Sequence, residues 1–440
     1  MQIDKKSDIL YNLLFFLPPA KKYRQKSGKE RIYVMKKILI GIAAFLLLAL
    51  IVRYPVIFSY ITLGYMLIVS IIAFTYKPFK GKFAPSCSII IPVFNESCHI
   101  YETVQSVMAS DYKNFEVIIV DDGSTDDSRN WIEKAKKEFS NIKTFYCAKN
   151  GGKKHALAKG IELAENEILV TIDSDSTIAP DALRKILIPF ENPQVGGVAG
   201  NINVKNIKEG IIPKLMDIIF VFSYEFLRSA QSKCGSVLCT PGALSAYRKS
   251  AVLPLVDEWL NKTFCGKKTV IGEDRELTCM LLKNKWEIVY QESAKAYTNM
   301  PVTYINLCKM LLRWVRGDIR ENILMLKYIL NNFSLSNAKS VGLTFHYVIF
   351  NIGVLSPIVM LPLLTVYLIF NFFTSVFLLK YVIMMIVLWS ILPMIIYTRK
   401  KSLKYSFHSI TYSLFSLLFL FWIPLYAILT LNNNKWLTRK

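Results

Sequence analysis

Long apolar runs stand on both sides of a charged central region, and this segregation constrains the fold of the 440-residue chain more than any other feature. Residues 38–52 and 56–76 are apolar, and residues 341–397 and 407–431 carry almost no charge. Between them, residues 77–330 alternate short apolar runs with charged stretches of helical pattern. Because a helix needs roughly 20 apolar residues to cross a bilayer, we expect an α/β domain inserted between transmembrane helices.

The same pattern predicts the boundaries of six regions. They are a basic cytoplasmic N-terminal segment (1–36), two transmembrane helices (37–76), a cytoplasmic α/β domain (77–300), amphipathic interface helices (301–335), C-terminal transmembrane or interface helices (336–431) and a terminal segment (432–440). No small-residue cleavage site follows the first apolar run, so we expect an anchor and not a removed signal peptide.

The net charge of +22 is distributed as in a membrane protein. Lysine and arginine concentrate in residues 1–37 and beside the apolar runs, which fits the positive-inside rule and attraction to anionic lipid. No nucleic-acid-binding signature with interleaved aromatic residues is present, so we expect no nucleic-acid partner. With the N-terminus inside, two crossings return the chain to the cytoplasm, which predicts a multi-pass plasma-membrane protein with a cytoplasmic domain.

The eight cysteines are scattered and include no Cys-x-x-Cys pair. This spacing favours neither a disulfide framework nor a zinc site. We expect reduced thiols in the core of a cytoplasmic domain.

Three apolar runs of the central region end in polar residues, at 88–96, 115–124 and 167–176. Helical stretches separate them, which predicts half of a doubly wound nucleotide-binding sheet. Ligands of such sheets bind beyond the carboxyl ends of the strands. Asp121 would stand there to accept hydrogen bonds from a ribose or a base, although an Asp-Asp-Gly turn is also typical of an ordinary loop.

Asp173 and Asp175 follow the third run directly. Two carboxylates one residue apart can hold a hard divalent cation, and that cation can hold a diphosphate. An isolated Asp-x-Asp is more often a solvated turn, so the pair alone does not decide between these readings.

Gly151, Gly152 and Lys153 lie between the second and third runs. The glycines allow close approach of a ligand, and Lys153 supplies a point charge for phosphate. A solvated basic loop is the alternative. We expect His155 to be structural, because the sequence suggests no partner for it.

Asp274 opens an amphipathic helix in Gly272-Glu273-Asp274-Arg275. Acidic residues in a first turn suit the helix dipole, and the functional alternative makes Asp274 a general base for an acceptor hydroxyl. Further on, Arg313 and Trp314 either anchor a helix at a membrane interface or form the floor of a sugar site.

Together these motifs resemble the processive family 2 glycosyltransferases, and most closely the hyaluronan and chitooligosaccharide synthases. The resemblance covers roughly residues 36–440. It is carried by Asp121-Asp122-Gly123-Ser124, Asp173-Ser174-Asp175, residues 228–232, residues 241–248, Gly272-Glu273-Asp274-Arg275 with the following Leu-Thr, Arg313-Trp314 and the terminal Trp436-Leu437-Thr438-Arg439.

The resemblance implies an α/β fold of GT-A type with a mixed sheet. It implies that Asp274 is the base of an inverting transfer that forms a β-linkage, with Arg313 and Trp314 at the diphosphate and acceptor site. It places Val93, Glu96, Asp121, Lys153, Asp173, Trp436 and Arg439 on the nucleotide sugar, Cys239, Gly242 and Leu244 at the acceptor, and Asp175 on Mg²⁺ or Mn²⁺.

Two positions depart from the family pattern. Met310 stands where a glutamine is usual, and Leu437 replaces a glycine of the terminal gating motif. Both bear on acceptor handling or gating, and neither affects the metal or the base. Topology is also open, because a cytoplasmic terminal motif requires either three crossings within 341–397 or a re-entrant segment at 407–431.

The resemblance predicts an enzyme that joins UDP-GlcNAc and UDP-GlcA into extracellular hyaluronan and passes the growing polysaccharide through the membrane. One alternative is a single-donor synthase of a chitin-like or other β-glycan, and another is a polyprenyl-phosphate glycosyltransferase. A membrane scaffold or transporter with an inactive domain is a different class, which the complete set of Asp173, Asp175 and Asp274 disfavours.

Overall fold

The computed structural model describes residues 55–334, 336–337, 339–348, 351 and 375–433. The chain forms two compact units, residues 1–63 and 64–440, and nearly all described residues belong to the second. The apolar run 38–52, most of residues 349–374 and the terminal Trp436 and Arg439 lie outside the described residues.

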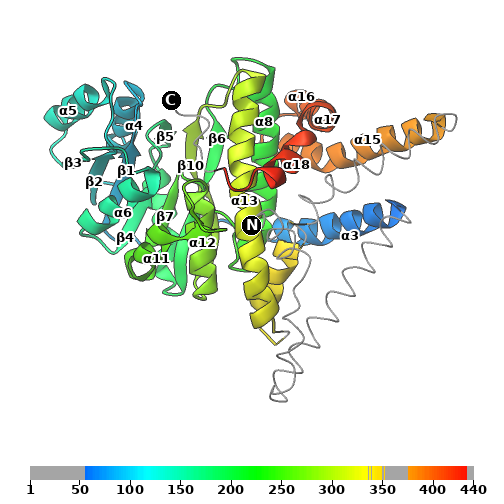
Figure 1. Cartoon of the computed structure of the whole chain (residues 1–440), viewed down its shortest axis with the longest axis horizontal. Coiled ribbons are helices and arrows are strands. Elements are labelled where there is room, and N and C mark those ends of the chain that lie inside the picture. Colours follow the sequence, from blue (N-terminus) through cyan, green and yellow to red (C-terminus); the bar gives the residue numbers. More distant parts are fainter. Residues whose placement is uncertain (1–54, 335, 338, 349–350, 352–374, 434–440) are drawn as a thin grey trace, which may run out of the picture. The chain divides into compact units, whose positions relative to one another are not determined.

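An eight-stranded mixed sheet forms the centre of the second unit, in the order β3-β2-β1-β4-β7-β6-β10-β5 (Figure 1). Strands β3, β2, β1 and β4 run parallel, β7 is antiparallel to both of its neighbours, and β5 is antiparallel to β10. The strands are β1 Cys87–Val93, β2 Phe115–Asp121, β3 Ile142–Tyr146, β4 Ile168–Thr171, β5 Ser176–Ile178, β6 Val195–Val204, β7 Ser245–Arg248 and β10 Glu287–Thr298. A separate hairpin pairs β8 Thr263–Phe264 with β9 Lys267–Lys268.

The parallel strands are built from β-branched side chains that are covered on both faces. All seven residues of β1 are buried, as are the last five of β2. Such continuous apolar strands need helices on both faces of the sheet. Right-handed crossovers place α4 and α5 on one face and α6 on the other, as Figure 1 shows.

Helices account for most of the remaining described residues. In the first part of the chain they are α3 Pro55–Phe74, α4 His99–Met108, α5 Ser128–Glu138, α6 Lys153–Leu163, α7 Ala182–Leu187, η2 Ile188–Glu191, α8 Ile211–Val221, the π-helix η3 Phe222–Arg228 and α9 Ser229–Lys233. They continue with α10 Lys249–Val252, η4 Leu253–Leu255, α11 Val256–Asn261, α12 Glu273–Lys283, α13 Tyr304–Asn332, α15 Ser375–Lys400, α16 Leu403–Ser406, α17 His408–Phe415, the π-helix η6 Ser416–Leu420 and α18 Trp422–Leu429.

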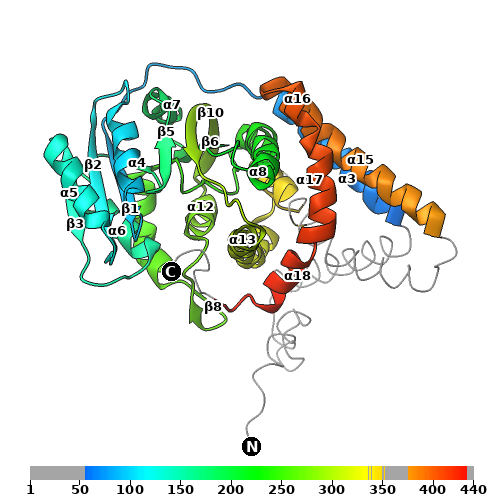
Figure 2. The ribbon, with the colours of Figure 1, turned by 90° about the horizontal axis from the view of Figure 1, so that it is seen from above.

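Helix α13 brings the C-terminal part of the chain to the sheet domain. It begins at Tyr304 and is capped by Thr303, whose side chain accepts a hydrogen bond from the amide of Asn306. It lies beside α12, as Figure 2 shows, and also contacts α18. One helix therefore connects the α/β domain with the apolar C-terminal helices.

Among the described residues, no single helix has both the length and the apolar composition needed to cross a bilayer. Residues 403–420 and 422–429 meet those criteria only as a pair, with a bend of 41° between them.

The cysteine prediction was right about pairing and partly wrong about burial. All eight cysteines are free thiols, and Cys87, Cys279 and Cys308 are buried. Cys98 and Cys265, however, are exposed, because they lie in turns outside the sheet.

Candidate active site

The carboxyl ends of β1, β2 and β4 meet at one edge of the sheet. Val93 at the end of β1 pairs in register with Asp121 at the end of β2, and Ile90 pairs with Thr171 of β4. Because these strands are parallel neighbours, the side chains that follow them gather at the same edge. The structure thus brings together Asp121 and the Asp173 loop, as the strand pattern predicted.

Asp121 is buried and already has two partners. Its Oδ1 accepts a hydrogen bond from the amide of Ser124 at 3.0 Å, and its Oδ2 lies 2.7 Å from Nε of Arg129. Arg129 was not predicted as a site residue. A nucleoside at Asp121 would therefore meet a carboxylate that is held and neutralised by an arginine.

Asp122 holds the glycine loop that precedes α6. Its carboxylate accepts hydrogen bonds from the amides of Gly151 at 2.9 Å and Gly152 at 2.7 Å. Gly152 has a φ of 95°, a conformation that a side chain would strain. Burial raises the pKa of Asp122, although the hydrogen bonds from these two amides act to lower it. The loop delivers Lys153 to the first turn of α6.

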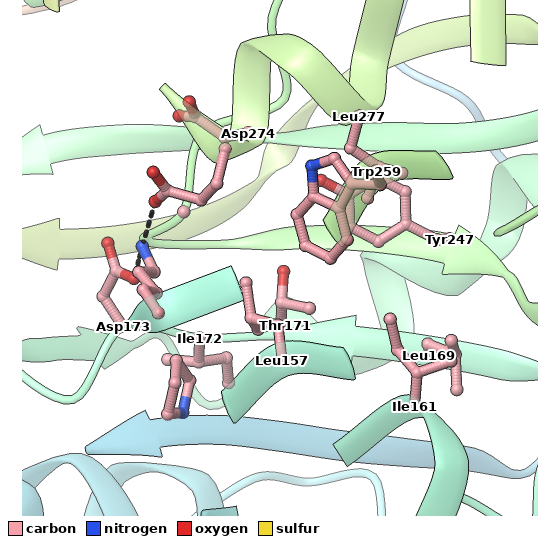
Figure 3. Close-up of a pocket in the computed structure, with 14 residues that line it drawn as sticks. Leu157, Ile161, Leu169, Thr171, Ile172, Asp173, Tyr247, Trp259, Asp274 and Leu277 are labelled. Carbon is pink, nitrogen blue, oxygen red and sulfur yellow. Dashed lines mark ion pairs between the residues drawn. The ribbon is translucent and has the colours of Figure 1, made fainter. Parts of the chain in front are cut away.

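Lys153 connects two carboxylates from different parts of the chain, marked by dashed lines in Figure 3. Its Nζ lies 2.6 Å from Oδ1 of Asp173 and 2.8 Å from Oε1 of Glu273. The two carboxylates raise the pKa of Lys153 in spite of its burial, so it stays protonated. In return, Lys153 and Arg313 hold the pKa of Glu273 below its usual range, against the effect of burial.

Lys153, Asp173 and Glu273 are called the Lys153 triad below. Gly242 has no side chain, and this leaves space for Lys153 and Asp173. A Cβ at this position would lie 2.7 Å from Nζ of Lys153 and 2.8 Å from Oδ2 of Asp173. The residue predicted at the acceptor therefore also borders the donor carboxylate. Gly242 is part of the cavity wall.

Asp274 lies at the start of α12, next to Glu273. Its Oδ1 accepts a hydrogen bond from the amide of Arg275 at 2.7 Å, and its Oδ2 lies 3.8 Å from Sγ of Cys239. Burial and, secondarily, the charge of Glu273 raise the pKa of Asp274 from 3.8 to about 6. A carboxylate with this pKa is ionised near neutral pH and is a stronger base than an exposed aspartate.

Two glycines allow α12 and α13 to approach closely. A Cβ on Gly317 would lie 3.2 Å from Cα of Gly272, and Gly272 has a φ of 84° at the start of α12. This contact sets α13 against the turn that carries Asp274.

Arg313 and Trp314 lie about one turn before Gly317 on α13. Arg313 is close enough to Glu273 to lower its pKa. Trp314 keeps 36% of its surface exposed and lies 6.3 Å, centroid to centroid, from the ring of Phe220 on α8. An indole that keeps a third of its surface exposed suits stacking on a sugar ring.

A cavity opens beside these charges, and its interior is mostly apolar. Figure 3 shows Asp173 and Asp274 at one end of it and Trp259, Tyr247 and Leu169 further in. Neither Tyr247 nor Trp259 was predicted as a site residue. Tyr247 lies within residues 241–248, which carry the family resemblance, whereas nothing in the local sequence of Trp259 distinguishes it from a core aromatic residue.

Other predicted residues lie outside the cavity wall. Val93 is buried and its carbonyl accepts the amide of Asp122 at 2.8 Å, while Glu96 is half-buried in the following turn. Leu244 is fully buried near Gly200 and does not line the cavity. Met310 is likewise a core residue of α13.

Asp173 and Asp175 have the chemistry of a divalent-cation site. Among the described residues, no group of three His, Cys, Asp or Glu side chains forms a metal site by itself. Mg²⁺, however, is commonly held by one or two carboxylates with substrate phosphates and water. Lys153 engages one oxygen of Asp173, and Asp175 is exposed, so the two carboxylates fit a cation that arrives with a diphosphate.

Comparison with known proteins identifies the family. Residues 88–253 match the family described as Glycosyl transferase family 2. Over 287 residues the chain is 33% identical to a hyaluronan synthase of Streptococcus pyogenes. The alignment covers 63% of this chain and 67% of that protein. The chain belongs to glycosyl transferase family 2.

This family 2 glycosyltransferase is also 30% identical over 361 residues to an N-acetylglucosaminyltransferase of Azorhizobium caulinodans. That alignment covers 81% of this chain and 88% of the relative. The mixed-sheet fold resembles a mannosyltransferase from Pyrobaculum calidifontis in complex with GDP-mannose and Mn²⁺, with a TM-score of 0.51 at 18% identity over 82% of this chain and 97% of the other. The predicted family, enzyme class and GT-A type of fold are thereby confirmed.

The close contact between Gly272 and Gly317 predicts that a larger residue at position 317 slows sugar transfer. In Gly317→Ala, the new Cβ pushes against the backbone of Gly272, and we expect sugar transfer to slow about tenfold because Asp274 and Trp314 separate. Lys327→Ala, at an exposed site on the same helix, is the control. Release of nucleoside diphosphate from a sugar donor measures both variants; equal rates would contradict the positioning role of this contact.

Proposed function

We propose that this glycosyltransferase polymerises UDP-sugars into an extracellular β-glycan, namely hyaluronan from UDP-GlcNAc and UDP-GlcA. One observation carries the proposal: a buried aspartate with a raised pKa, Asp274, adjoins a lysine–carboxylate triad at the carboxyl edge of the sheet. The names of the relatives support the sugar class, since one is a hyaluronan synthase and another an N-acetylglucosaminyltransferase.

In the proposed reaction Asp274 takes the proton of an acceptor hydroxyl. The hydroxyl oxygen then attacks the anomeric carbon from the face opposite the diphosphate, so the C–O bond to UDP breaks and the configuration inverts. Burial favours this role because it raises the proton affinity of Asp274. Lys153 and Arg313 supply positive charge near the departing diphosphate.

Asp173 and Asp175 are the proposed ligands of Mg²⁺ or Mn²⁺. When bound, such a cation neutralises charge on the diphosphate. Asp121 is proposed to bind the nucleoside, with Val93 and Glu96 nearby. Trp314 would support the acceptor sugar, with Cys239 and Gly242 on the acceptor side, whereas the burial of Leu244 removes it from direct contact with the acceptor.

The membrane is proposed to hold the chain on both sides of the α/β domain. The apolar runs within 37–76 and 336–431 would hold the protein in the plasma membrane, with residues 77–300 in the cytoplasm, 301–335 at the interface and the polysaccharide passing outward. Trp436 and Arg439, in the terminal segment 432–440, would close over bound nucleotide.

A second candidate uses UDP-GlcNAc alone and makes a chitin-like oligosaccharide. The Azorhizobium relative favours it, because its name refers only to N-acetylglucosamine transfer and its alignment covers more of this chain. A base at Asp274 fits both candidate reactions equally well, because each of them forms a β-linkage to an acceptor hydroxyl.

Donor dependence separates the two candidates. Purified protein in detergent with Mg²⁺ or Mn²⁺ is given UDP-GlcNAc and UDP-GlcA, singly and together, and the products are sized and digested with hyaluronidase. We expect hyaluronidase-sensitive polymer only with both donors. Polymer from UDP-GlcNAc alone would overturn the hyaluronan proposal in favour of the second candidate.

The base role predicts both a mutant phenotype and a pH profile. Asp274→Asn should lower kcat by about a thousandfold while UDP still binds, because only the proton acceptor is lost. In the wild type, protonation of Asp274 as the pH falls through about 6 should lower kcat about tenfold per pH unit. Loss of UDP binding in Asp274→Asn, or a flat profile between pH 5 and 7, would show that Asp274 is not the base.

Metal binding predicts a separate result for Asp175. Calorimetric titration with UDP, with and without Mn²⁺, should show that Asp175→Ala loses the Mn²⁺-dependent part of the affinity, because one of two carboxylate ligands is removed. Asp111→Ala, whose carboxylate pairs with Arg184, is the control. Unchanged Mn²⁺ dependence in Asp175→Ala would remove Asp175 from the metal site.

A further inference from the structure

A second set of buried charges lies next to the Lys153 triad and takes no part in the proposed reaction. Its members are two lysines and two glutamates, each with a side chain no more than 11% exposed: Lys154, Lys262, Glu276 and Glu321. Nζ of Lys154 lies 2.7 Å from Oε2 of Glu276, and Nζ of Lys262 lies 2.7 Å from Oε1 of Glu321. These four residues are called the buried tetrad below.

The tetrad repeats the connection between α6 and α12 that the active site makes. Lys154 directly follows Lys153 on α6, and Glu276 lies one helical turn after Glu273 on α12. The two helices are therefore joined by two lysine–glutamate pairs, at 2.8 Å in the site and 2.7 Å in the tetrad. A second pair restricts the rotation and the sliding that a single pair would leave free.

Lys262 extends the connection to α13. Its Nζ also lies 3.9 Å from Oε1 of Glu276, while Glu321 belongs to the same helix as Arg313 and Trp314. The hydroxyl of Thr269 accepts a hydrogen bond from Lys154 at 2.9 Å and donates one to Glu276 at 3.0 Å. The tetrad thus joins the three helices that carry Lys153, Asp274 and Trp314.

Stability alone does not account for these charges. Burial lowers the pKa of Lys154 and raises that of Glu276, even though the two side chains form an ion pair. Each shift favours the neutral form, which means that the pairing does not fully offset the loss of water. Apolar side chains of similar volume would stabilise such an interior as well or better, whereas ion pairs impose a particular geometry.

We propose that the buried tetrad positions the catalytic groups: Lys154, Lys262, Glu276 and Glu321 hold α6, α12 and α13 in the register at which Lys153, Asp274 and Trp314 face one transfer site. The inference rests on the proposed base role of Asp274. None of the four side chains is proposed to touch the substrate. They act only through the placement of the helices.

The test replaces one pair of the tetrad without leaving a buried charge unpaired. In the double variant Lys154→Met/Glu276→Leu we expect a thermal midpoint within a few degrees of the wild type, because an apolar pair of similar size fills the space. We expect kcat to fall about tenfold to a hundredfold, with the KM for the UDP-sugar and the UDP affinity within about threefold of the wild type.

The pH profile separates positioning from folding. Asp274 faces Glu273 on its own helix, Lys153 on α6, Asp173 after β4 and Cys239 before β7. A shift of α12 against α6 changes those distances, so the acid limb of kcat should move in the double variant. A variant that only reduces the amount of folded enzyme keeps the wild-type acid limb.

Two further variants guard against ambiguous results. Lys154→Arg retains a cation for Glu276 and should keep kcat within about threefold of the wild type. Glu321→Gln keeps the shape of the side chain but loses its charge, and should lower kcat with UDP binding retained, which provides a test if the double variant does not fold.

An ion pair at the opposite edge of the sheet, with Lys143 half-exposed, is the control for charge removal away from the site. Lys143 and Glu116 pair at 2.7 Å near the amino end of β2. We expect Lys143→Met/Glu116→Gln to leave kcat and the acid limb unchanged. If the tetrad variants behave like this control, or lose activity only in proportion to unfolded protein, the tetrad does not position the site. Retained transfer in Asp274→Asn would instead overturn the proposed function.

Discussion

The proposed active site depends on one buried cation, Lys153, shared by Asp173 and Glu273. Asp173 follows β4, Glu273 begins α12, and Lys153 begins α6, so one ammonium group holds together three elements that are far apart in the sequence. Without it, two carboxylates beside Asp274 would repel one another in a region of poor solvation. With it, Glu273 stays ionised and its charge helps to keep the pKa of Asp274 raised.

Glycines make this density of charge sterically possible. Gly242 leaves room for Lys153 and Asp173, and Gly272 and Gly317 let α13 approach the turn that carries Asp274. A side chain at any of these positions would displace a charged group or a helix backbone by several tenths of an ångström. Proton transfer and nucleophilic attack are sensitive to displacements of that size. The role of these glycines is therefore to set distances between groups that they never contact chemically.

The sequence predicts the strands and their carboxyl ends well, because β-branched runs that stop at polar residues are a local signal. Asp121 and Asp173 were proposed from these strand ends, and Lys153 from the two glycines that precede it. The pairing of Lys153 with Glu273 was not, since it joins residues 120 positions apart and no local period records it. Arg129 on Asp121, and the burial of Leu244, were missed for the same reason: both depend on how separate elements pack.

The structure also changes the meaning of one departure from the family pattern. Met310, where a glutamine is usual, had suggested altered acceptor handling. Its side chain is buried in the core on the inner face of α13, so this methionine contributes to helix packing and is not part of the cavity wall. A substitution that changes packing behind Arg313 and Trp314 acts on their position, as the buried tetrad is proposed to do. If the enzyme selects its sugar at this cavity, the selecting groups are those of the cavity wall, which Gly242, Tyr247 and Trp259 share with Asp274.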